Sequence, residues 1–80
     1  QRLEFSAALL TVQIYDHEHS KNYPFESSLA NLIVHMKWPK RFAEKVISFA
    51  LHHRYIKPEK DYYKLTLLGR EVAKKSIEMT

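Results

Sequence analysis

Apolar side chains at the start of the chain recur every three or four residues, which is the spacing of one face of an α-helix. This first stripe consists of Leu3, Ala7, Leu10 and Ile14. It predicts a helix over residues 2–15. A second apolar stripe runs beside the first and consists of Phe5, Ala8, Leu9 and Val12.

Two stripes cover more than one face of this helix, and an 80-residue chain has difficulty burying both. Two interpretations follow. In one, the helix is central and packs on both sides. In the other, it also contacts a second copy of the chain or the remainder of a larger parent protein. The second interpretation makes Phe5, Leu9 and Val12 a candidate partner surface.

A polar connection follows over residues 16–27, and a second helix is predicted from there to about Lys37. Asn22, Pro24 and two serines favour turns in the connection, and Ser27 or Ser28 would cap the helix. Its apolar positions have the spacing of a single buried face: Leu29, Leu32, Ile33 and Met36.

Trp38-Pro39 separates this helix from a third, predicted over residues 39–54. Proline disfavours helix at the residue before it but suits the first turn of the next helix. The third helix has one apolar side, with Phe42, Val46, Phe49 and Ala50. The short break between the two helices is typical of a helix-turn-helix.

The last third of the chain predicts a hairpin and a final helix. Residues 55–57 and 62–65 are the expected strands, with a turn at 58–61 that contains Pro58. Thr66 would cap a helix over residues 67–78, which Leu68, Val72 and Ile77 would pack onto the core. The order predicts a mainly helical α+β fold, a winged helix-turn-helix with three to four helices and a small β-hairpin wing, as one domain over residues 1–80.

Composition narrows the classes of function. The net charge of +4 permits binding to nucleic acids, and the absence of cysteine excludes disulfides and thiolate metal sites. The apolar runs are much shorter than the roughly 20 residues of a membrane span. The chain starts at Gln1 rather than Met, so we expect a fragment of a larger protein. We expect it in the cytoplasm, either free or as the soluble domain of an inner-membrane protein. We expect no enzymatic activity and no cofactor, because no nucleophile–base spacing or glycine-rich phosphate loop is present.

The polar side of the third helix is the first candidate site, with duplex DNA as the candidate partner. In a winged helix this helix enters the major groove. Arg41, Lys45 and Ser48 would face bases and Lys40 the backbone, and the hairpin would add Lys57, Lys60 and Lys64. Glu44 lies within this surface and is unfavourable for DNA. The alternative is a solvated charged face on a domain that binds protein.

The run Asp16-His17-Glu18-His19 is the second candidate site. Imidazole and carboxylate groups suit zinc, manganese or iron, and His17 and His19 are the candidate ligands for a divalent metal. Consecutive loop residues seldom converge on one ion, so the alternative is a solvated loop.

The segment Leu65-Thr66-Leu67-Leu68-Gly69-Arg70, together with the second and third helices, resembles the DNA-binding half of iron- and manganese-dependent repressors of the diphtheria-toxin-repressor type. Multiple-antibiotic-resistance-type regulators share this wing motif. The whole chain is similar to the cytoplasmic C-terminal extension of some bacterial metal-ion ABC transporter permeases. This similarity lies in Arg2-Leu3-Glu4-Phe5, Leu9-Leu10, His17-Glu18, Trp38, Phe42-Ala43 and Val46.

The resemblance implies a non-enzymatic regulatory or interaction module attached to a manganese, zinc or iron uptake system. The alternative it implies is the DNA-binding domain of a metal-responsive transcription regulator.

Overall fold

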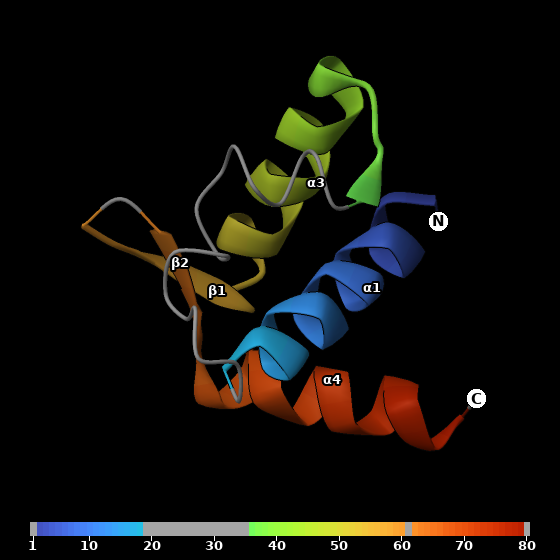
Figure 1. Ribbon diagram of the computed structural model, residues 1–80, viewed down its shortest axis with the longest axis vertical. Helices are drawn as coiled ribbons and strands as arrows, with labels where there is room; N and C mark the ends of the chain where they lie inside the picture. Colours follow the sequence, from blue (N-terminus) through green and yellow to red (C-terminus); the bar gives the residue numbers. More distant parts are fainter. Residues whose placement is uncertain (1, 19–35, 61, 80) are drawn as a thin grey trace.

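The computed structural model describes residues 2–18, 36–60 and 62–79. The elements in these residues are α1 (Arg2–His17), α3 (Lys40–His52), β1 (Ile56–Glu59), β2 (Tyr62–Leu65) and α4 (Leu67–Glu78). The hairpin lies between α3 and α4 (Figure 1). This order confirms a mainly helical α+β fold and is consistent with winged-helix topology. The second helix predicted from the sequence lies almost entirely outside the described residues, as do its proposed serine caps.

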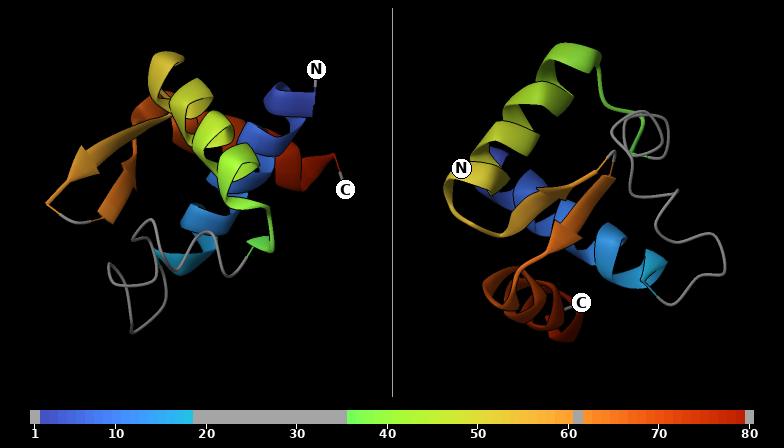
Figure 2. Two further views of the ribbon diagram at one scale, coloured as in Figure 1. Left: turned by 90° about the horizontal axis from the view of Figure 1, so that it is seen from above. Right: turned by 90° about the vertical axis from the view of Figure 1, so that its left-hand side faces the viewer.

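Helix α1 is the centre of the described structure, because it packs against both α3 and α4. The hairpin projects away from the helices, on the side opposite the two chain termini (Figures 1 and 2). The core lies where α1, α3 and the base of the hairpin meet. Its buried residues are Ala7, Leu10, Ile14, Val46, Ile47, Ala50, Ile56 and Leu65.

The first stripe of α1 is buried as predicted, at Ala7, Leu10 and Ile14. The helix is longer than expected and ends at His17 rather than at residue 15. Asp16 and His17 are therefore helical, and the prediction of a loop at these two residues was wrong. An imidazole in the last turn of a helix is compatible with the helix dipole.

Helix α3 ends in a Schellman motif built on Arg54. The amide of Tyr55 donates to the Ala50 carbonyl oxygen at 2.8 Å, and the Arg54 amide donates to Leu51 at 3.1 Å. Arg54 has φ 61°, the left-handed conformation that glycine usually supplies at this position. The sharp exit places β1 directly after the helix.

The hairpin pairs Ile56 with Leu65 and Lys57 with Lys64. Ile56 and Leu65 are buried, so the next pair along the strands faces outward. The predicted turn at 58–61 was wrong, because Pro58 and Glu59 belong to β1 and the strands are joined by two residues. A two-stranded sheet has only edge strands, where proline is tolerated.

Thr66 is the N-cap of α4, as predicted. Its hydroxyl oxygen accepts a hydrogen bond from the Gly69 amide at 2.9 Å. The same hydroxyl lies 2.5 Å from the Arg54 carbonyl oxygen and 3.2 Å from that of Tyr55, so it donates back to the end of α3. The Thr66 amide also donates to Tyr55 at 3.0 Å. One residue thus joins the exit of α3 to the entry of α4.

Helix α4 packs through small residues rather than through the large apolar ones. Gly69 and Ala73 are its buried residues, whereas Leu68 is 51% exposed and Ile77 is 41% exposed. Of the three residues predicted to hold the helix to the core, Val72 is half-buried, and the prediction was wrong for Leu68 and Ile77. At Gly69 the backbone of α4 lies so close to Tyr55 that a Cβ atom there would clash with the Tyr55 carbonyl oxygen.

Candidate functional site

The predicted basic surface is exposed in full. All of its residues are exposed to solvent: Lys40, Arg41, Lys45 and Ser48 on α3, and Lys57, Lys60 and Lys64 on the hairpin. In the described part of the chain, the ion pair joins Glu18 and Arg70, and none of these cations takes part in one.

Two of these cations face each other across the hairpin. Lys57 and Lys64 are directly opposed in the strand register. Like charges at directly opposed positions destabilise an antiparallel pair. The pairing concentrates positive charge on the outward face of the hairpin at a cost in stability.

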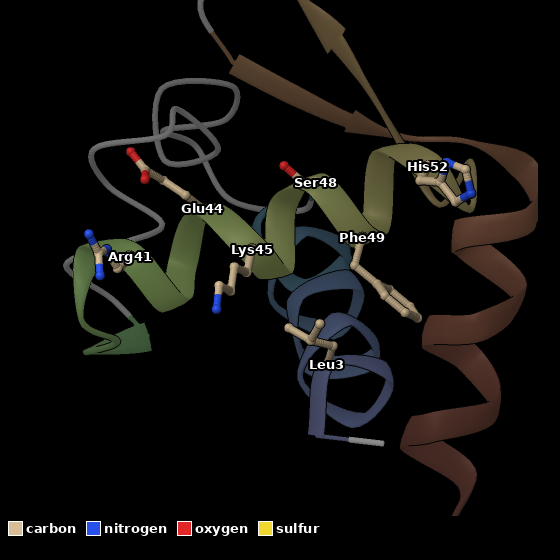
Figure 3. A pocket seen from close by; sticks show the side chains of 7 residues that line it. All are labelled: Leu3, Arg41, Glu44, Lys45, Ser48, Phe49 and His52. Atoms are coloured by element: carbon tan, nitrogen blue, oxygen red, sulfur yellow. The ribbon is translucent and has the colours of Figure 1, made fainter.

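An open groove of about 500 Å³ runs along the exposed side of α3 (Figure 3). Phe49 of α3 and Leu3 of α1 form the apolar part of this groove. Lys45 projects from the same edge of α3 as Phe49. Glu44 and Ser48 project from the opposite edge of the same exposed face. The carboxylate of Glu44 therefore lies among the cations and the serine of the predicted basic surface on α3. The remaining residues that line the groove are Arg41 and His52.

His53 follows Phe49 on the apolar side of α3, where the helical spacing of the sequence had allowed it to lie. The centroid of the His53 ring lies 4.1 Å from that of Phe49 and 5.9 Å from that of Tyr55. The spacing of four residues between Phe49 and His53 was the available signal, since residues at i and i+4 are neighbours on a helix.

The candidate partner surface on α1 is also exposed. Phe5 is 66% exposed and Leu9 is 39% exposed, and Val12 is half-buried. These residues lie on the side of α1 opposite its buried stripe, because successive residues are rotated by about 100° around a helix. The predicted second stripe is therefore a surface feature of the described structure.

An apolar groove of about 510 Å³ extends this surface toward the start of α3. Trp38 and Phe42 form its second wall, with their rings edge to face at a centroid distance of 5.6 Å. The guanidinium of Arg2 lies 5.6 Å from the centroid of the Phe42 ring, within the range of a cation–π contact. The sequence signal for this wall was the spacing of four residues between Trp38 and Phe42, which by itself did not predict a groove.

The candidate metal ligands do not form a described site. His17 is buried, with its Nε2 atom 2.9 Å from Nε2 of Gln13. Both carboxylate oxygens of Glu18 accept hydrogen bonds from Arg70, at 2.5 and 3.0 Å. His19 lies outside the described residues. Within the described ranges, no group of three or more histidine or acidic side chains could hold a metal ion.

No family model, curated protein or solved structure matches this chain. Functional proposals therefore rest on the fold, on its surfaces and on the residue pattern of the sequence. No helix in the part of the chain that the structure describes has the length and apolar character needed to cross a membrane.

Proposed function

We propose that this domain is a non-enzymatic winged-helix module through which a bacterial metal-ion ABC permease, for manganese, zinc or iron, makes regulatory or assembly contacts. The observation that carries the proposal is the exposed apolar surface of Phe5 and Leu9, continued by the groove beside Trp38 and Phe42. Exposed apolar surface that continues into a groove is typical of protein-contact sites. The link to metal uptake is supported by the resemblance of the chain to permease extensions.

Sequencing the coding region upstream of Gln1 tests whether this domain is attached to a membrane permease. This region should encode several apolar segments of about 20 residues each, the length of a membrane-spanning helix. An upstream region without such segments would overturn the permease assignment while leaving the surface on α1 unaffected.

The regulatory role is tested in the full-length protein with Phe5→Glu/Leu9→Glu. We expect the rate of radiolabelled manganese or zinc uptake, or its response to external metal, to change, because two charges would occupy an apolar contact. The matched control is Leu67→Glu/Met79→Glu, which places the same charges on exposed apolar positions of α4. Equal uptake by both double variants and the unchanged protein would contradict the proposal.

A second candidate function is favoured by the exposed cations of α3 and the hairpin. In this alternative the domain is the DNA-binding part of a metal-responsive transcription regulator. Arg41 and Lys45 lie one turn apart on the exposed side of α3, the helix that enters the major groove in this class of fold. Such binding would lose affinity steeply with salt, because each phosphate contact releases counterions.

The DNA alternative is tested by titrating random duplex DNA into the 80-residue domain at low and physiological salt. Arg41→Ala/Lys45→Ala should lower the affinity at least tenfold at low salt. Lys74→Ala/Lys75→Ala on α4 removes the same charge from other exposed positions and should have a much smaller effect. Equal losses of DNA affinity in the two double variants would indicate an effect of net charge alone. They would exclude α3 as the helix that contacts the DNA bases.

A further inference from the structure

The exposed side of α1 carries the spacing of a coiled-coil seam. Arg2, Phe5, Leu9, Val12 and Asp16 follow one another at intervals of three, four, three and four residues. This alternation is the a and d spacing of a heptad, in which apolar residues face a partner helix. The three apolar residues lie at the centre of the seam, and one charge of each sign lies at either end.

The two terminal charges oppose the dipole of their own helix. Arg2 lies in the first turn of α1 and Asp16 in the last, whereas the dipole favours anions at the start and cations at the end. Glu4, on another side of the first turn, follows the dipole. The charges on the seam therefore gain nothing from α1 itself, and in the described residues Asp16 has no ion pair.

We propose that two copies of this chain associate through this seam, with their α1 helices antiparallel around a two-fold axis at Leu9. Arg2 and Asp16 lie at equal distances in sequence on either side of Leu9. An antiparallel arrangement therefore places each Arg2 against Asp16 of the second copy, about 10 Å from the axis. The two Leu9 side chains meet each other, and Phe5, four residues before Leu9, lies next to Val12 of the second copy, three residues after it.

Charge complementarity selects this orientation. A parallel pair would bring Arg2 next to Arg2 and Asp16 next to Asp16, and like charges across a helix pair are unfavourable. An antiparallel two-fold pair is isologous and closes after two copies, so it gives a dimer and not a filament. The groove walled by Trp38 and Phe42 adjoins Phe5 and Leu9 and adds apolar area at each end of the seam.

The inference rests on the proposed use of α1 as a partner surface and specifies the partner. The seam is short, and specific dimers commonly bury roughly 800 Å² on each copy. The association is therefore expected to be weak and to depend on protein concentration. The other occupant of this surface would be the remainder of the parent protein, which the experiment separates from a second copy.

Sedimentation equilibrium of the 80-residue chain, over a wide range of concentrations, tests the dimer. The unchanged chain should show a monomer–dimer equilibrium, and Leu9→Glu should raise the dissociation constant at least 100-fold, since two glutamates would meet at the axis. Leu67→Glu on α4 should leave the constant unchanged. Circular dichroism checks that each variant retains its helices. A chain that is monomeric at every concentration would overturn the dimer, while the uptake test of the proposed function would still stand.

A charge exchange tests the orientation. Arg2→Glu and Asp16→Arg should each weaken the dimer about five- to twentyfold, because each replaces two attractive contacts with two repulsive ones. The double variant should restore association to near the original value. Both single substitutions agree with the dipole of α1, so weakening cannot be attributed to a damaged helix. Additive losses in the double variant would contradict the antiparallel pairing.

Discussion

A Cβ atom on Gly69 would stand 1.8 Å from the carbonyl oxygen of Tyr55. The φ of Gly69 is not positive, so glycine is needed here for space and not for an unusual backbone conformation. The Thr66 amide donates to the same carbonyl oxygen at 3.0 Å. This contact holds the start of α4 against the end of α3 and explains why a glycine follows Leu65-Thr66 at this spacing.

Gly69→Ala is therefore expected to destabilise the domain by at least about 2 kcal/mol, because the clash is with backbone that cannot move freely. At an ordinary helix position the same substitution would stabilise by about 1 kcal/mol through helix propensity. Urea denaturation followed by circular dichroism measures the difference. Lys74→Ala, at an exposed position of α4, should change the free energy of unfolding by less than about 0.5 kcal/mol. An unchanged or raised stability for Gly69→Ala would show that α4 does not approach Tyr55 in this way.

The hydroxyl of Thr66 gives a second test of the same junction. It caps the Gly69 amide and donates to the end of α3, so Thr66→Val should cost about 1–2 kcal/mol while keeping the shape of the side chain. Thr66→Ser retains the hydroxyl and should recover most of the loss. Both values come from thermal and urea unfolding. Equal losses for Val and Ser would assign the effect to the methyl group and contradict the capping role.

Local signals in the sequence were sufficient for several elements. Pro39 is the N-cap residue directly before α3, which covers Lys40–His52 and is slightly shorter than the predicted 39–54. Thr66 marks the start of α4, because a proline and a hydroxyl cap act on their immediate neighbours. The final helix and the second strand have the predicted bounds. The two-residue loop was missed because Lys60 occupies a left-handed position, φ 53°, where glycine or asparagine would have been recognised.

The packing of α4 could not be predicted from apolar periodicity, because Gly69 has no side chain to mark the buried side. The contact between Glu18 and Arg70 joins residues 52 positions apart, which no local pattern indicates. The exposure of Lys45 and Phe5 follows from the opposite, buried side of each helix, whereas the use of these residues as contact surfaces stays a prediction. The grooves beside them were missed, because each needs residues from two segments.

Arg54 is a position where a substitution is expected to raise the stability of the domain. Its left-handed conformation in the Schellman motif costs a non-glycine residue about 1 kcal/mol. Arg54→Gly should therefore raise the free energy of unfolding by about 0.5–1 kcal/mol. Arg54→Ala removes the same charge but keeps the conformational cost, and it should give no gain. A similar gain from both variants would attribute the effect to charge instead.

The ion pair between Glu18 and Arg70 fastens the end of α1 to α4, and the Arg70 guanidinium also lies 5.9 Å from the centroid of the Tyr15 ring. Both partners are partly shielded from solvent, so their coupling should exceed that of an exposed pair. A double-mutant cycle with Glu18→Gln and Arg70→Met is expected to give a coupling of about 1–2 kcal/mol. The value should fall only slightly in high salt. A coupling near zero would mean that the pair does not contribute to the junction.

A substitution at the opposed lysines of the hairpin should change folding stability and DNA affinity in opposite directions. Lys64→Glu converts the repulsion with Lys57 into a cross-strand ion pair, which should stabilise the domain by about 0.5 kcal/mol. If the domain binds DNA, the same substitution should weaken binding, because a cation is replaced by an anion on the outward face of the hairpin. The two effects then have opposite signs, which a damaged fold could not produce.

Two control variants make this comparison quantitative. Lys64→Gln removes the repulsion without adding an attraction, so its stability should lie between those of the unchanged protein and Lys64→Glu. Lys75→Glu makes the same charge change on exposed α4 and should lower DNA affinity less at equal ionic strength. Loss of stability in Lys64→Glu would contradict the register that opposes the two lysines. Equal losses of DNA affinity for Lys64→Glu and Lys75→Glu would show that the hairpin contacts no phosphate. We would then expect the hairpin lysines to contact an acidic protein surface.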